Sequence, residues 1–80
     1  MRIPRDLSGG DLIKRLGRLG YAVTRQTGSH IRLTCRSRGE HHITVPNHDP
    51  LRIGTLAAIL DAVAAHHGLT RDELLQRLFG

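Results

Sequence analysis

Aromatic residues and cysteine are almost absent from this 80-residue sequence, which has no tryptophan, one phenylalanine, one tyrosine and one cysteine. A lone cysteine, Cys35, cannot form an internal disulfide, which excludes a small secreted protein held together by disulfides and favours a reducing compartment. With so few aromatic rings, the chain also lacks the platform on which typical single-strand binders stack bases. Any nucleic acid would therefore be held mainly through its backbone.

Long hydrophobic runs are missing as well. No apolar segment approaches the ~20 residues that are needed to cross a bilayer. The first residues, Met1 to Arg5, lack the apolar stretch of a signal peptide. We therefore expect no membrane association and a cytoplasmic location.

Negative charge is scarce, because seven acidic residues stand against twelve basic ones and the net charge is +5. This balance favours polyanionic partners through counterion release rather than acidic small molecules. All but one of the basic residues are arginines, whose planar guanidinium suits phosphate recognition. RNA, DNA and an acidic protein all remain possible partners.

Two longer helices are predicted from apolar residues at helical spacing. The first runs from Gly9 to Leu19; Ser8 can cap its first N–H groups, and Gly20 can end it in a left-handed conformation. The second is expected to begin with Thr55 as its cap and to end at Gly68.

Three strands are predicted between these helices, over Tyr21 to Arg25, Ser29 to Arg36 and His41 to Val45, with a turn at residues 26–28. In the second strand the period of two separates an apolar side from a polar, basic side. The apolar side holds Ser29, Ile31, Leu33 and Cys35, and the polar side holds His30, Arg32, Thr34 and Arg36. In the third strand Ile43 and Val45 should face inwards, and His42 and Thr44 outwards.

A third, short helix is predicted after Thr70, because Thr70-Arg71-Asp72-Glu73 has the pattern of a capping box. The order is helix, three-stranded antiparallel sheet, helix and short helix, which predicts an α+β fold with the helices on one sheet face. We expect residues 1–80 to form one domain. Because so few elements can bury only one face of the sheet, the face with His30, Arg32 and Thr34 should be exposed.

His30 is the leading candidate for a catalytic residue. It follows the small residues Gly28 and Ser29, which allow a ligand to approach closely, and Arg32 lies on the same face. Cleaving RNA requires a base for the 2′-hydroxyl, an acid for the leaving 5′-oxygen and cations for the developing charge. An imidazole can serve either proton step, and no metal ion is needed. The alternative is that His30 is an ordinary exposed strand residue.

The other histidines do not form a metal-binding motif. His41-His42 and His66-His67 are adjacent pairs, and neighbours on a strand point to opposite faces instead of converging. We therefore predict no metal and no other cofactor. His48, in the loop after the third strand, is either a helper at the same site or an ordinary turn residue.

Three basic residues of the first helix, Lys14, Arg15 and Arg18, lie opposite its apolar stripe. They are either solvated charges or a ridge that grips phosphates. Cys35 is expected to be a small buried residue rather than a nucleophile.

Four short motifs occur in the order Leu12-Ile13-Lys14 with Leu16 and Leu19-Gly20-Tyr21, then Arg25-Gln26-x-Gly28-Ser29-His30, then Ile43-Thr44-Val45-Pro46-x-His48, then Ile53-Gly54-Thr55-Leu56-x-x-Ile59-Leu60. Each is short and degenerate, but the set is much more specific than any one motif. Together they resemble the HicA-type toxins of bacterial toxin-antitoxin pairs over about residues 8 to 75.

The resemblance implies a fold like that of double-stranded-RNA-binding domains and the activity of an mRNA interferase, a small endoribonuclease that cleaves messenger RNA. It implies that His30, in the Gly-Ser-His segment, is the catalytic residue and that a HicB-type antitoxin covers this site. Many members have two consecutive histidines after the serine, whereas Ile31 follows His30 here. The region from Thr70 to Phe79 is short or variable in the family.

The favoured hypothesis is a metal-independent endoribonuclease that transfers protons through His30. Its expected RNA contacts are Gly28, Ser29, Arg32, Lys14, Arg15, Arg18 and His48. The alternative is a non-catalytic RNA-binding module of the same fold. A third possibility is that the exposed sheet edge and basic face bind only an acidic protein.

Overall fold

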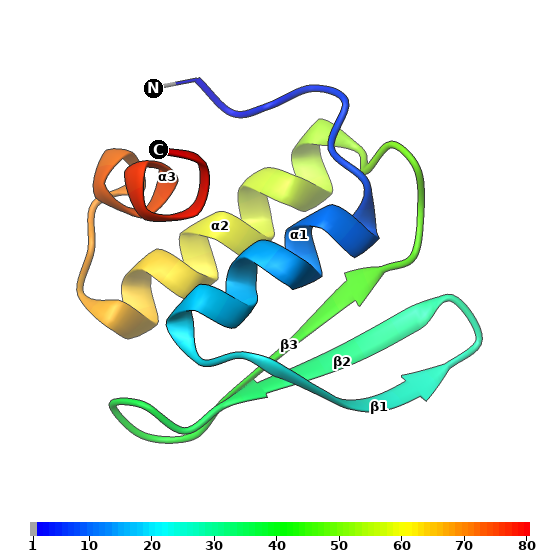
Figure 1. Ribbon diagram of the computed structural model, residues 1–80, viewed down its shortest axis with the longest axis horizontal. Coiled ribbons are helices and arrows are strands. Elements are labelled where there is room, and N and C mark those ends of the chain that lie inside the picture. Colours follow the sequence, from blue (N-terminus) through cyan, green and yellow to red (C-terminus); the bar gives the residue numbers. More distant parts are fainter. Residues whose placement is uncertain (1) are drawn as a thin grey trace.

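The computed structural model describes residues 2–80, and its course is shown in Figure 1. Its elements are α1 (Gly9–Leu16) with the short 3-10 helix η1 (Gly17–Leu19), β1 (Ala22–Thr27), β2 (His30–Cys35), β3 (His41–Pro46), α2 (Ile53–His67) and α3 (Arg71–Phe79). The strands form one antiparallel sheet of order β1-β2-β3. This confirms the predicted layout.

The helices form a layer on one face of the sheet. α1 and α2 lie side by side across that face, and α3 packs against both of them near the two chain ends (Figure 1). The core between the layers is largely aliphatic: Leu12, Leu16, Leu33, Val45 and Leu60 are completely buried there. No other element of residues 2–80 covers the opposite face of the sheet (Figure 1), so that face is open to ligands.

The ends of α1 and α3 follow the predicted signals. The Ser8 hydroxyl accepts a hydrogen bond from the backbone N–H of Asp11, and Gly20 takes the left-handed conformation with φ of 91°. Thr70 and Glu73 form the predicted capping box, in which each side chain bonds to the backbone N–H of the other. Local hydrogen bonds therefore mark where these helices begin.

The predicted start of α2 was wrong. The helix begins at Ile53, its N-cap is Arg52 without a side-chain hydrogen bond, and Thr55 lies inside the first turn. The tertiary structure accounts for the difference, because Leu51 is buried and donates its backbone N–H to the carbonyl of Leu7. This anchor fixes the chain directly before Arg52.

The first hairpin is also longer than predicted. β1 continues to Thr27, and the turn consists of Gly28 and Ser29. Ser29 is therefore an exposed turn residue rather than an inward residue of β2. Gly28 has a φ of 57°, a conformation that glycine adopts without the steric cost of a side chain. The prediction had placed the turn two residues too early.

The expected division of the sheet into two faces is confirmed with one exception. Ile31, Leu33 and Cys35 are buried, while His30 and Arg32 are exposed. Thr34 lies on the open face, as predicted, but it is only 6% exposed. Side chains of the neighbouring strands cover it, so the polar side of β2 is accessible only at His30 and Arg32.

Candidate functional site

His30 is the first residue of β2 and lies on the open face. The sheet register places it between Thr27 of β1 and Pro46 of β3. The imidazole is exposed, and among residues 2–80 it has no hydrogen-bonding or charged partner. Both ring nitrogens are therefore available to a ligand.

The segments around His30 are fixed by backbone contacts. The N–H of Asn47 donates to the Ser29 carbonyl, at 2.6 Å, so the turn before β2 is tied to the end of β3. The N–H of Gly9 donates to the His48 carbonyl, at 2.8 Å. A Cβ atom on Gly9 would collide with the Pro46 carbonyl oxygen, so only glycine permits α1 to begin this close to β3. His30 thus stands on a rigid part of the scaffold.

The side chain of His48 is exposed in the loop that follows β3. It lines a hollow of about 290 Å³ together with Pro46, Leu51, Arg52 and Thr55. Pro46 is the register partner of His30, and His48 follows Pro46 by two residues. The structure thus brings the loop of the second candidate to the same end of the sheet as the first.

Arg32 is two residues along β2 from His30, on the same face. Its register partners are Arg25 on β1 and Thr44 on β3. The side chains of both arginines are exposed, and neither makes a hydrogen bond or ion pair within the described part of the chain. Two guanidinium groups and a hydroxyl thus form the row of the open face that follows His30.

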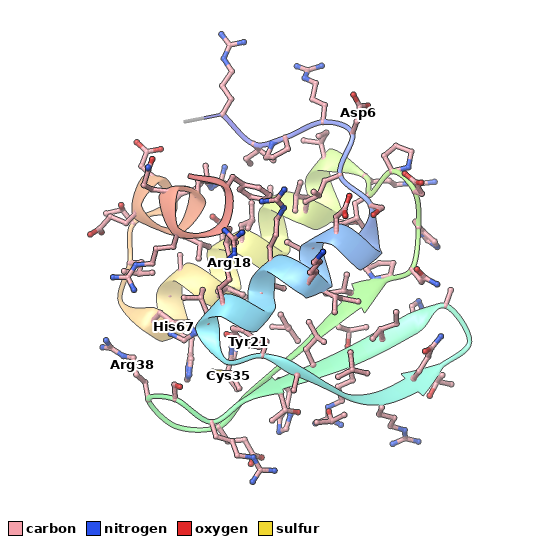
Figure 2. All side chains as sticks on the ribbon, viewed as in Figure 1. Asp6, Arg18, Tyr21, Cys35, Arg38 and His67 are labelled. Carbon is pink, nitrogen blue, oxygen red and sulfur yellow. The ribbon has the colours of Figure 1, made fainter. Side chains whose placement is uncertain are left out.

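The three basic residues predicted to bind RNA, Lys14 and Arg15 of α1 and Arg18 of η1, are on the other side of the molecule. The guanidinium of Arg15 donates to the carbonyl of Leu78 at 2.9 Å and lies 4.8 Å from the ring centre of Phe79. Arg18 donates to the same carbonyl at 3.0 Å, and Figure 2 shows it on the side of α1 that faces α3. Lys14 is exposed and makes no such bond to residues 2–80. The structure does not bring these residues together with His30.

A second histidine cluster lies at the opposite end of the sheet, and the sequence did not predict it. The hydroxyl of Tyr21 hydrogen-bonds to His41 Nδ1 at 2.7 Å and to His67 Nε2 at 3.2 Å. The ring of His66 stacks on that of His41 at 4.4 Å, and its Nε2 donates to the carbonyl of Ser37. His41 and His42 point to opposite faces, as predicted, but His41 stacks on His66 and shares the Tyr21 hydroxyl with His67.

Burial dominates the electrostatics of this cluster. It lowers the pKa of His67, and repulsion from His66 and Arg38 lowers it further. Burial also lowers the pKa of His41 and raises the pKa of Tyr21 to about 12. Figure 2 shows Tyr21, His67 and Arg38 gathered where the β2–β3 turn meets the end of α2. Tyr21 is hydrogen-bonded both to His41 of β3 and to His67 of α2, so the cluster joins the sheet to α2.

The imidazole of His42 also lies on the open face, but both of its ring nitrogens are hydrogen-bonded. Its Nε2 bonds to a carboxylate oxygen of Glu40 at 2.8 Å, and its Nδ1 bonds to the Thr34 hydroxyl at 2.8 Å. The Thr34 hydroxyl also bonds to that of Thr24 at 2.9 Å. These bonds explain why Thr34 is buried, and they leave neither nitrogen of His42 available.

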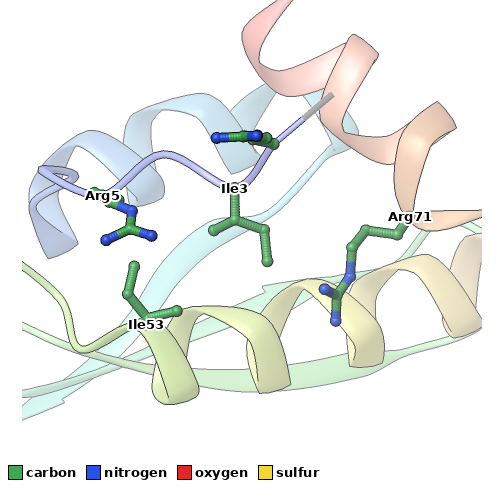
Figure 3. A pocket seen from close by; sticks show the side chains of 5 residues that line it. Ile3, Arg5, Ile53 and Arg71 are labelled. Carbon is green, nitrogen blue, oxygen red and sulfur yellow. The ribbon is translucent and has the colours of Figure 1, made fainter.

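Concave surfaces also occur on the helical side. A cleft of about 390 Å³ is lined by Arg2, Ile3, Arg5, Ile53 and Arg71, and Figure 3 shows the two isoleucines between Arg5 and Arg71. Arg71 is already paired with Asp61, at 2.6 Å. The cleft contains no histidine and is separated from His30 by the helical layer.

Residues 2–80 contain neither a cluster of metal ligands nor a membrane-spanning helix. Within this range no three or more His, Cys, Asp or Glu side chains are grouped so that they could hold a metal ion. None of the helices in the same range has both the length and the apolar character of a membrane span. Cys35 is completely buried, as predicted, and its thiol contacts the carbonyl of Leu19.

Comparison with protein families supports the sequence motifs. A family model described as the HicA toxin of bacterial toxin-antitoxin matches residues 9–64, which is more than half of the chain and extends from the start of α1 into α2. The chain belongs to the HicA toxin family. No curated protein and no solved structure gives a significant match.

Membership in the HicA family establishes the general role. The protein is the toxin of a toxin-antitoxin pair, and toxins of this family are RNA-cleaving enzymes that act on messenger RNA and are paired with an antitoxin. The matched region contains His30, Arg32 and the loop with His48, whereas α3 lies outside it.

Proposed function

We propose that this HicA-family toxin is a metal-independent endoribonuclease that cleaves messenger RNA with His30 as its catalytic residue. The observation that carries the proposal is an exposed imidazole with no partner in residues 2–80, on an open face that also bears Arg32. An imidazole retained for stability would be buried and bonded, as His67 is. An imidazole that is exposed and unpaired on a strand can bind a ligand and exchange protons with it.

The proposed reaction is a transesterification. His30 accepts the proton of a 2′-hydroxyl, the 2′-oxygen attacks the neighbouring phosphorus, and the bond to the 5′-oxygen breaks. The products are a 2′,3′-cyclic phosphate and a 5′-hydroxyl, which receives one proton. Because the attacking and leaving oxygens lie on opposite sides of phosphorus, the second proton transfer needs another donor. We assign it to His48, whose loop lies at the same end of the sheet.

The remaining predicted residues have supporting roles in this proposal. The Arg32 guanidinium neutralises charge that develops on the phosphate oxygens. Gly28 and Ser29 shape the turn so that an RNA strand can approach His30. Lys14 is an outlying phosphate contact, whereas Arg15 and Arg18 have to exchange their bonds to the Leu78 carbonyl before they can bind RNA.

The proposed antitoxin is of the HicB type and acts by covering the open face around His30. This face is basic and unobstructed, so an acidic protein surface is complementary to it. Because messenger RNA is the substrate, we place the toxin in the cytoplasm.

The proposal is tested with the His30→Ala and His48→Ala variants. Purified proteins are incubated with RNA in excess chelator, and growth is followed after induction in bacteria. We expect His30→Ala to abolish cleavage and growth arrest, and His48→Ala to slow cleavage to a smaller extent. A folded His30→Ala protein that remains fully toxic refutes the catalytic assignment.

The RNA ends distinguish the mechanism from its alternatives. We expect 2′,3′-cyclic phosphate ends from the wild-type protein, and a 3′-hydroxyl end excludes the transesterification. Binding of RNA without scission identifies instead a non-catalytic RNA-binding module. Loss of cleavage in chelator, with recovery on adding a divalent cation, contradicts the metal-independent step.

A further inference from the structure

The side-by-side placement of Arg25 and Arg32 depends on an irregularity of β1. Val23 pairs with Leu33, so regular pairing would place Thr24 opposite Arg32 and Arg25 opposite Ile31, which faces the helices. The register instead shifts between Val23 and Arg25, and Arg25 becomes the partner of Arg32. Because directly opposed residues share a face, this bulge turns Arg25 onto the open face.

This arrangement is unfavourable for the isolated protein. Directly opposed residues have Cβ atoms about 4.5 to 5.5 Å apart, and like charges at that distance destabilise a sheet. The third member of the row is Thr44, a neutral hydroxyl. Within residues 2–80 no carboxylate pairs with either guanidinium. Glu40, in the turn between β2 and β3, is bonded to His42 and lies 4.0 Å from Arg36. The pair therefore offers an uncompensated double positive charge to a ligand.

The position of the pair along β2 indicates which ligand it fits. Arg32 is two residues from His30, which corresponds to roughly 6.6 Å along a strand. Successive phosphates of a nucleotide chain are separated by a similar distance. A strand whose scissile phosphate lies at His30 would place the neighbouring phosphate over Arg25 and Arg32, whose planar forks suit phosphate oxygens.

We propose that Arg25 and Arg32 form a two-guanidinium clamp, created by the bulge in β1, for the RNA phosphate adjacent to the scissile one. This inference rests on the proposed function, because it uses His30 to locate the scissile phosphate. Arg25 is then a substrate-positioning residue, one that sequence periodicity does not reveal. The clamp binds the backbone, so it adds affinity and register but no base preference.

The test compares Arg25→Thr with Arg5→Thr, both in a His30→Ala background. The two substitutions remove the same charge, but Arg5 lies beyond the helical layer and has no hydrogen bond or ion pair to residues 2–80. The probe is a fluorescent single-stranded RNA oligonucleotide titrated at several salt concentrations. For Arg25→Thr we expect roughly tenfold weaker binding and a salt slope reduced by about 0.7. Arg5→Thr should change both much less.

Thermal unfolding without RNA supplies an independent readout. Relief of the repulsion should raise the Tm of Arg25→Thr by about 1 to 4 °C, whereas loss of a merely structural arginine lowers it. Inorganic phosphate should raise the Tm of the parent protein more than that of Arg25→Thr. Arg25→Lys, which keeps the charge but not the fork, should recover most of the salt slope and only part of the affinity.

Unchanged RNA affinity and salt slope in Arg25→Thr overturn the clamp. So does a variant that keeps its RNA affinity but no longer binds the antitoxin, because the pair would then be a protein contact. Failure of the clamp proposal can be distinguished from failure of the catalytic proposal. Weaker binding by Arg25→Thr, with no cleavage by wild-type protein, supports the clamp and refutes His30 catalysis.

Discussion

The two ends of the sheet use histidine in opposite ways. At one end His30 is exposed and has no partner among residues 2–80. At the other end His41 and His67 are both bonded to the hydroxyl of Tyr21, and His67 is only 8% exposed. Histidine side chains are thus available to a ligand at one end of the sheet and hydrogen-bonded within the protein at the other.

The difference shows that the number of histidines is a poor guide to chemistry, whereas their bonding is a good one. The cluster around Tyr21 links β3 to the end of α2, so we expect it to contribute stability. On the face around His30, Arg25 stands directly beside Arg32, and this pair of like charges does not stabilise the sheet. We therefore expect this face to contribute function rather than stability.

The largest expected effect is on the RNA cleavage rate, and it should differ between two histidines of the same open face. His30→Asn should lower the RNA cleavage rate by roughly 10²- to 10⁴-fold, because a group that transfers protons is lost. His42→Asn should retain cleavage within about one order of magnitude, since both nitrogens of His42 are already bonded. Rates are measured with a labelled RNA at equal protein concentration. Equal losses in the two variants would contradict the distinction between available and bonded histidines.

The next largest effect is on stability, and here the Tyr21 cluster should matter more than His30. Tyr21→Phe removes the hydroxyl between His41 and His67 and leaves ring nitrogens without their partner. We expect the free energy of unfolding to fall by about 1 to 3 kcal/mol, measured by urea denaturation. His30→Asn is the control, because an exposed substitution should change it by less than about 0.5 kcal/mol. Cleavage per folded Tyr21→Phe molecule should remain normal.

Acid should weaken the histidine cluster around Tyr21. In the folded protein the pKa values of His41 and His67 are lowered, chiefly by burial. As the pH falls below about 6.5, the unfolded chain binds protons before these folded imidazoles do, so stability falls. The slope should approach about 1.4 kcal/mol per pH unit for each such proton.

Urea denaturation between pH 8 and pH 5 measures this dependence. The charged and titratable groups around the two imidazoles are Tyr21, Cys35, Arg38, His42, His66 and Arg77. His67→Gln should flatten the dependence because the amide does not titrate. A slope that is unchanged in His67→Gln would show that this imidazole is not a source of the pH dependence.

The smallest expected effect concerns α3, which belongs to neither end. Thr70→Ala removes the hydroxyl that caps this helix, and we expect a loss of about 1 kcal/mol in stability. Because α3 meets Arg15 and Arg18 rather than His30, RNA cleavage per folded molecule should not change. Thermal unfolding and the RNA assay check the two parts separately. A specific loss of cleavage would connect α3 to the active face.

Local signals were enough to predict much of the fold. Ser8, Gly20, Gly68 and the Thr70 capping box act on neighbouring backbone groups, so their effect is visible in the sequence. The start of α2 was mispredicted because burial of Leu51, rather than a cap, sets it. Local rules do not report contacts between distant segments.

The candidate site was predictable in part for the same reason. The period of two placed His30 and Arg32 on one face, and the structure agrees. Arg25 was missed because a bulge shifts the register of β1, and a regular alternation cannot anticipate an extra residue. The Tyr21 cluster was missed because its members lie far apart in the chain, and only the packing of α2 over the sheet brings them together.

By itself, the sequence determined the order of the elements, the apolar sides that form the core and the strand that presents His30, because these depend on spacing and on bonds within a few residues. The tertiary structure decided which histidines remain available, which arginines become neighbours and where α2 begins. Those outcomes depend on register and on contacts between distant segments, and hydrogen bonds formed there determine which polar groups are left for a ligand.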